Sequence, residues 1–248
     1  GWEGGRGGTE GLRDGVGGKG ARGPAKGRCW KGRWPVGQPR GNRLAIGRNY
    51  AKQAAESARA WGEQIKPPTV FTKAQTSITG PYDDIAIDPA ISDKIDWEVE
   101  LGVVIGTRGA NIKLGDAMSH VFGYTVVNDM SARDIQNGWG GQFFKGKSLD
   151  ASSPVGPWVV TADEIPDVQN LRVSLRVNGE TKQDGNTRAL LNSLAQLVAW
   201  RSVGLAHLPG RLTPPGPPAR RALRPTPPHV PTAATGAAHA SQHAAPVP

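Results

Sequence analysis

The amino-acid sequence predicts a mixed fold of the α+β class, in which short strands dominate and short helices connect them. Apolar runs of strand length recur between residue 44 and about residue 200, and Gly, Pro and polar residues separate them. Asn178-Gly179 is a strong signal for a two-residue hairpin, because both residues tolerate a positive φ. The chain of 248 residues shows no regular strand–helix–strand alternation and no internal repeat, which argues against a parallel α/β sheet.

Each expected element follows from a local pattern. The clearest strand is 97–106, and a second buried strand, 121–127, ends just before Asp129. Apolar residues after the candidate caps Asn186 and Thr187 fall on one helical face. In chain order, the expected strands and strand-like apolar runs are 44–47, 69–73, 85–87, 97–106, 121–127, 157–161 and 171–177, and the expected helical segments are 51–61, 114–120 and 187–198.

Composition divides the chain into three parts. The formal charge of +9 arises from the two ends, because residues 1–43 carry +7 and residues 201–248 carry +5, which leaves −3 for 44–200. Glycine crowds the first part, and eleven of the 21 prolines lie in the last. Neither end can bury enough apolar surface to offset its chain entropy. We therefore expect disordered flanks at 1–42 and 201–248 around a folded body at 43–200.

Several classes of protein are disfavoured. One cysteine, Cys29, excludes an internal disulfide framework. No apolar run approaches the ~20 residues that a membrane span needs. A nucleic-acid binder that uses the basic ends stays open as an alternative, but interleaved aromatic residues and a known reading motif are missing. We expect a cytoplasmic protein, with a mitochondrial location as the alternative, and neither nucleic acid nor membrane as a partner.

Three carboxylates form the most informative pattern. Glu98 and Glu100 alternate with apolar residues on one strand, so their side chains point to the same face, and Asp129 follows a second strand. Carboxylates that gather in one place repel each other, and they stay ionised only if a cation joins them. Oxygen donors without nearby Cys or His favour Mg²⁺ or Mn²⁺ over zinc. This pattern predicts a divalent-metal enzyme.

Several motifs in order resemble the fumarylacetoacetate hydrolase family, nearest to its bacterial-type and acylpyruvase-like branch. The resemblance covers about residues 43–200 and rests on Gly47–Ala51, Phe71–Lys73, Asp96–Leu101, Gly123–Thr125, Asn128–Asp134, Gly146–Ser148 and Val177–Gly179. It implies a β-roll fold, a homodimer when the domain is intact, and Mg²⁺ or Mn²⁺ as the cofactor. It also implies C–C hydrolysis of small 2-oxo or 1,3-dicarbonyl acids, with decarboxylation, hydration or isomerisation as alternatives.

The resemblance assigns roles to individual residues. Glu98, Glu100 and Asp129 would be the metal ligands. Lys147 would neutralise the charge of an enolate or contact the substrate, and Arg133, Gln136 and Lys73 would bind the substrate. The family activates water with a His-Glu pair on a helix; Glu56 stands at the glutamate position, but Gln53 stands at the histidine position. Glutamine cannot act as a base near neutral pH.

The same resemblance predicts a truncated β-roll. We expect the match to stop near Trp200, so that a further strand, a Gly-Asp segment and a Thr-Gly-Thr-Pro-like loop that helps to close the substrate site are missing. We hypothesise that both flanks are translated from a wrong frame or from retained non-coding sequence. Unpaired strand edges and exposed core would then make the protein prone to aggregation, or leave an inactive remnant of the enzyme.

Structural roles stay open for each candidate. Glu98 and Glu100 could lie on a solvated strand face, and Asp129 could cap a turn. Arg133 could pair with Asp134 or Glu100 as a structural ion pair. The remaining candidates could be exposed polar residues of loops, helices or strand edges: Lys147, Gln136, Glu56 and Lys73.

Overall fold

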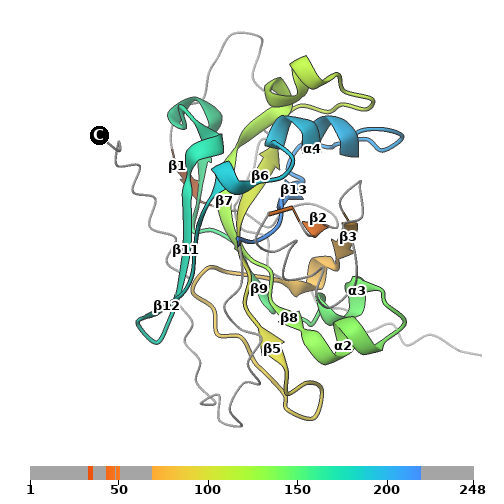
Figure 1. Ribbon diagram of the computed structural model, residues 1–248, viewed down its shortest axis with the longest axis vertical. Coiled ribbons are helices and arrows are strands. Elements are labelled where there is room, and N and C mark those ends of the chain that lie inside the picture. The colour runs from red at the N-terminus through yellow and green to blue at the C-terminus, as the bar shows by residue number, and fades with distance from the viewer. Residues whose placement is uncertain (1–32, 36–42, 48, 51–68, 219–248) are drawn as a thin grey trace, which may run out of the picture. The chain divides into compact units, whose positions relative to one another are not determined.

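The central feature of the fold is a five-stranded antiparallel sheet. The computed structural model describes residues 33–35, 43–47, 49–50 and 69–218, with side chains from residue 43 onward (Figure 1). All of them belong to one unit of the chain, residues 31–248. The strand order is β1-β10-β7-β6-β13, with β1 Arg33–Pro35, β10 Trp158–Thr161, β7 Val121–Asn128, β6 Val99–Ile105 and β13 Leu212–Thr213.

Four two-stranded sheets complete the strand-rich architecture. The β4–β9 pair is parallel and the other three pairs are antiparallel. The pairs are β2 Arg43–Gly47 with β3 Thr69–Lys73, β4 Ile78–Thr79 with β9 Ser153–Pro154, β5 Ile95–Asp96 with β8 Ser131–Ala132, and β11 Arg172–Val177 with β12 Glu180–Asn186.

The helices are short. Helices α2 and α3 pack on each other beside β8 and β3, and α4 packs on η2 (Figure 1). Within the described ranges, no helix combines the length and the apolar character needed to cross a bilayer. The helices are α2 Arg133–Gly138, α3 Phe143–Gly146 and α4 Leu194–Arg201, and the 3₁₀ segments are η1 Gln75–Ser77, η2 Leu114–His120, η3 Ala162–Glu164, η4 Val168–Asn170 and η5 Thr187–Ala189.

The core forms where the central sheet meets α4. Leu101 and Val103 of β6 pack with Leu194, Leu197 and Val198 of α4 in the main apolar cluster. Val99 points into a second cluster with two residues of β11. The apolar face of β6 is thereby buried, which confirms a strand-rich mixed fold and fixes the opposite face for the carboxylates.

Local chemistry accounts for the elements that were predicted correctly. The Asn178-Gly179 turn joins β11 to β12 with φ values of 52° and 80°, as the hairpin signal required. The predicted helix at 187–198 is shorter, because Asn186 caps η5 and a capping box of Ser193 and Gln196 starts α4. The apolar run at 85–87 has no strand partner, so the prediction of a strand there is wrong.

The predicted flanks are partly ordered. Residues 33–35 form the edge strand β1 and pair with β10, although 1–42 was expected to be disordered. Residues 201–218 belong to the folded body: β13 pairs with β6, and Leu212 is 2% exposed. Backbone pairing and apolar burial outweigh the proline content that suggested a disordered tail. The helix at 51–61 lies outside the described residues.

This ordered segment contains an uncompensated buried cation. Arg201 is 4% exposed, and its three guanidinium nitrogens have no hydrogen-bond partner among the described residues. Burial, together with the nearby charge of Arg211, lowers the pKa of Arg201 to about 9. Burial and the charge of Arg201 also lower the pKa of His207. Positive groups therefore meet here, and no acid in the described part of the chain bonds to Arg201.

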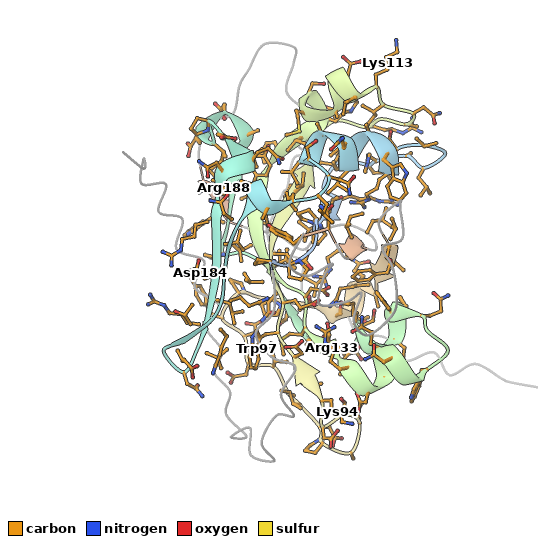
Figure 2. The ribbon with its side chains drawn as sticks, viewed as in Figure 1. Lys94, Trp97, Lys113, Arg133, Asp184 and Arg188 are labelled. Atoms are coloured by element: carbon orange, nitrogen blue, oxygen red, sulfur yellow. The ribbon has the colours of Figure 1, made fainter. Side chains whose placement is uncertain are left out.

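Replacing Arg211 with glutamate is expected to raise the free energy of unfolding by about 1–3 kcal/mol, because a carboxylate would replace a repelling charge beside the unpaired guanidinium. Urea unfolding of the full chain measures the change. Arg188→Glu is the matched control, because Arg188 is exposed on η5 (Figure 2). An equal effect of both variants, or a loss of stability in Arg211→Glu alone, would contradict the expectation.

Candidate metal centre

Strand pairing brings the three predicted carboxylates together. β6 and β7 run antiparallel with Val99 opposite Asn128, so Glu98 and Asp129 face each other just beyond that rung. The Asp129 N–H donates to the Glu98 carbonyl at 2.7 Å. One carboxylate oxygen from each of Glu98, Glu100 and Asp129 lies within 4.8 Å of the others. All three residues are buried, so the solvated strand face considered for the two glutamates is wrong.

Two buried lysines complete the cluster. Lys147, at the end of α3, donates to Glu98 Oε2 at 2.5 Å, to Asp129 Oδ2 at 2.7 Å and to Ser131 Oγ at 2.8 Å. Lys73, the last residue of β3, donates to Asp129 Oδ1 and to the Met130 carbonyl. Neither lysine is an exposed loop or edge charge, because they are 3% and 0% exposed.

Arg133 and Gln136 lie at the edge of the cluster on α2. Arg133 donates to Asp96 Oδ2 at 2.6 Å and to Glu98 Oε1 at 2.7 Å, and it also bonds to the Gln136 side-chain oxygen. The ion pairs proposed for Arg133 with Asp134 or Glu100 are therefore not the ones formed. Gln136 is 5% exposed, so it is not a surface residue.

The remaining predicted site residues cannot be placed. Gln53 and Glu56 lie outside the described residues. Three residues that bond to the cluster were not predicted from the sequence: Asp96, Ser131 and Gly216. The Gly216 N–H donates to Glu100 Oε2 at 2.9 Å. Gly216 lies in the segment that was predicted to be a disordered tail, and no local sequence signal links it to a residue 116 positions away.

The charges of the carboxylates in the cluster are compensated to different extents. Burial would raise the pKa of Asp129, but the ammonium groups of Lys147 and Lys73 hold it well below its usual range. Burial and the neighbouring Asp129 raise the pKa of Glu100 to about 8. Burial lowers the pKa of Lys73 to about 7, although the contact with Asp129 opposes that shift. Asp129 is thus fully compensated, whereas Glu100 is not.

This imbalance fits a divalent cation. Lys147, Lys73 and Arg133 satisfy Glu98 and Asp129, but Glu100 Oε1 is buried and has no hydrogen-bond partner among the residues that the structure describes. A carboxylate oxygen left in this state is costly unless a cation neutralises it. Glu98, Glu100 and Asp129 offer oxygen donors only, which suits Mg²⁺ or Mn²⁺.

Sequence comparison relates the chain to known enzymes. A family model described as fumarylacetoacetate hydrolase, C-terminal, matches residues 43–226, which extends beyond the predicted end near Trp200. A Burkholderia ambifaria protein named "Putative hydrolase" is 48% identical over 181 residues, which make up 71% of this chain and 62% of that protein. The chain therefore spans less than two thirds of that relative's length.

The chain also resembles solved structures, both in sequence and in fold. A fumarylacetoacetate hydrolase from Exiguobacterium antarcticum is 36% identical, with a TM-score of 0.67 over 76% of this chain and 68% of that one. A 2-hydroxyhepta-2,4-diene-1,7-dioate isomerase from Mycobacterium marinum is 32% identical, with a TM-score of 0.63 over 72% and 64%. A 5-carboxymethyl-2-hydroxymuconate delta-isomerase from Mycobacterium smegmatis is 33% identical, with a TM-score of 0.63 over 75% and 70%.

Proposed function

Because the chain belongs to the fumarylacetoacetate hydrolase family, we propose that it is a divalent-metal-dependent hydrolase that cleaves a C–C bond in small 2-oxo acids. The proposed substrates are of the acylpyruvate or fumarylacetoacetate type. The observation that carries the proposal is the buried group of Glu98, Glu100 and Asp129, in which Glu100 Oε1 has no hydrogen-bond partner in the described part of the chain. These residues would hold the ion, which we propose to be Mg²⁺ or Mn²⁺.

The side chains around the cluster suit an enolate. A divalent cation held there would polarise the 2-oxo group and lower the energy of the negative charge that develops on its oxygen. Lys147 and Lys73 place two ammonium groups against the same carboxylates, so an enolate beside them would meet fixed positive charge. We propose that Arg133 and Gln136 donate hydrogen bonds to oxygen atoms of the substrate, because both side chains lie at the edge of the cluster.

Hydrolysis of an acylpyruvate would consume one water molecule and give a carboxylic acid and pyruvate. The bond between the methylene carbon and the acyl carbon breaks. The hydroxyl group of water joins the acyl carbon, and a proton joins the methylene carbon to give pyruvate. The role of Glu56 and Gln53 in activating that water stays a prediction.

A second candidate function is isomerisation of an unsaturated 2-hydroxy or 2-oxo dicarboxylic acid. Two of the similar solved structures carry isomerase names, at 32% and 33% identity. Isomerisation moves a proton through an enolate and consumes no water. It would use the same carboxylates and lysines and would not need a water-activating base.

Mg²⁺ or Mn²⁺ is expected to start the conversion of acetylpyruvate to acetate and pyruvate by the full chain, and EDTA is expected to stop it. Loss of the absorbance of the enolised diketone, together with enzymatic detection of pyruvate, measures the reaction. Oxaloacetate tests decarboxylation in parallel, and a 2-hydroxy-2,4-dienedioate tests isomerisation. Mn²⁺ binding without turnover of any of these compounds would favour the inactive-remnant alternative and overturn the proposal.

A further inference from the structure

Arg43 is a buried cation that the sequence analysis assigned no role. It is the first residue of β2 and lies directly opposite Lys73 of β3 in the antiparallel register. Residues directly opposite each other in an antiparallel pair project to the same face. Arg43 is 1% exposed and Lys73 is 0% exposed, so both cations are buried on the face that meets the carboxylates.

The guanidinium bonds to two serines from distant segments. Arg43 Nη1 donates to Ser153 Oγ of β9 at 2.9 Å, and Nη2 donates to Ser77 Oγ of η1 at 2.7 Å. Each serine hydroxyl in turn donates a hydrogen bond to a main-chain carbonyl: Ser153 to that of Asn128 at 2.7 Å, and Ser77 to that of Ala74 at 2.7 Å. Both serines are fully buried.

Only the Ser153 arm ends on the main chain of the carboxylates, because the Ser77 arm ends beside Lys73, which donates to Asp129. Asn128, held by Ser153, precedes Asp129 in the chain, and its side-chain oxygen accepts from the Glu98 N–H at 3.0 Å. The path Arg43–Ser153–Asn128 therefore ends on the main chain of two predicted metal ligands. The arm through Ser77 ends on Ala74, which contacts none of the three carboxylates in the described part of the structure.

We propose that Arg43 is a positioning residue of the metal centre, which fixes the spacing of Glu98 and Asp129 through Ser153 and Asn128. This inference rests on the proposed metal centre and assigns to it a residue outside the ligand set. Mutation of groups that hold ligands in place in this way typically costs about 10–100-fold in metal affinity.

The charge of Arg43 also acts on the cluster. Its hydrogen-bond partners among the described residues are neutral hydroxyls, so no contact within that part of the chain cancels the positive charge. Burial lowers the pKa of Arg43 to about 10, while Asp129 and Glu100 oppose that shift, so the guanidinium remains charged at neutral pH. It thus stabilises the ionised state of the carboxylates without occupying a position that a cation would need.

The two serines provide a matched test. Each accepts from the same guanidinium and donates to one carbonyl, so Ser153→Ala and Ser77→Ala remove equivalent hydrogen bonds. Ser153→Ala is expected to weaken Mn²⁺ binding about tenfold, whereas Ser77→Ala should have a clearly smaller effect, because its arm ends beside Lys73 and not on a carboxylate residue. Electron paramagnetic resonance of free Mn²⁺ measures the dissociation constant, and thermal unfolding measures stability in the same samples.

A double-mutant cycle tests the path itself. Arg43→Lys keeps the positive charge but cannot donate to Ser153 and Ser77 at the same time. It is expected to weaken Mn²⁺ binding as much as Ser153→Ala does. The double variant should be no weaker than either single variant, because both changes interrupt one path. If Ser153→Ala and Ser77→Ala alter Mn²⁺ affinity equally, or if neither alters it, the inference is overturned. If the wild-type chain binds no Mn²⁺, it is the proposed function that fails.

Discussion

Replacing Glu100 with glutamine is expected to weaken Mn²⁺ binding at least about 100-fold, the upper end of what loss of a merely supporting residue costs. Turnover should disappear with it. Glu100 Oε1 is the buried carboxylate oxygen of the cluster that no donor within the described ranges satisfies, so a bound cation would gain most from it. Paramagnetic resonance of free Mn²⁺ and a turnover assay with acetylpyruvate measure the two losses.

The stability of the metal-free variant separates this loss from unfolding. Glutamine keeps a carbonyl oxygen that can accept from the Gly216 N–H, and it cannot take on the charge that burial disfavours on Glu100. The metal-free Tm is therefore expected to stay the same or to rise, since an uncompensated buried carboxylate costs free energy. Glu180→Gln is the control, because Glu180 is exposed on β12. Unchanged Mn²⁺ affinity in Glu100→Gln would rule out Glu100 as a ligand.

Asp129→Asn is expected to lower the free energy of unfolding by about 3–5 kcal/mol, because it leaves buried ammonium groups without their shared counter-charge. Asp129 bonds to Lys73 through one oxygen and to Lys147 through the other. Lys147 keeps Glu98, whereas Lys73 keeps only a main-chain carbonyl. Urea unfolding of the metal-free full chain measures the loss, and Mn²⁺ binding should disappear in the same variant.

A second substitution should recover part of that stability. Lys73→Met in the Asp129→Asn background removes the buried ammonium group that has lost its counter-charge. The double variant is therefore expected to be more stable than Asp129→Asn alone. Asp184→Asn is the matched control: it breaks an exposed ion pair with Arg172 and should change stability by less than about 1 kcal/mol. If Asp129→Asn and Asp184→Asn have equal effects, Asp129 does not compensate the lysines.

The two substitutions separate the contributions of the carboxylates. Glu100→Gln should remove metal binding and spare the fold, whereas Asp129→Asn should damage both. This contrast follows from the hydrogen bonds alone, because Asp129 is paired with two lysines and Glu100 with one main-chain N–H. Both outcomes can be read before any substrate is identified.

Parts of the fold could be predicted because the relevant signals are local. The alternation along 97–101 placed Glu98 and Glu100 opposite an apolar face, and Asn178-Gly179 fixed the β11–β12 turn. The segment 202–218 was misjudged because its prolines and lack of apolar period are typical of disorder. Its order depends on pairing of β13 with β6, more than a hundred residues earlier in the chain.

The sequence by itself determined the strand-rich class and the three carboxylates, since residue type and side-chain alternation are properties of short segments. The roles expected for the lysines came from the resemblance to the family. Only the tertiary structure decided that Lys73 and Lys147 converge on Asp129, and that Gly216 bonds to Glu100. It also decided that Arg43 reaches the carboxylates through Ser153, 110 positions away. Such contacts arise when distant strands pair, and no local pattern encodes which ones do.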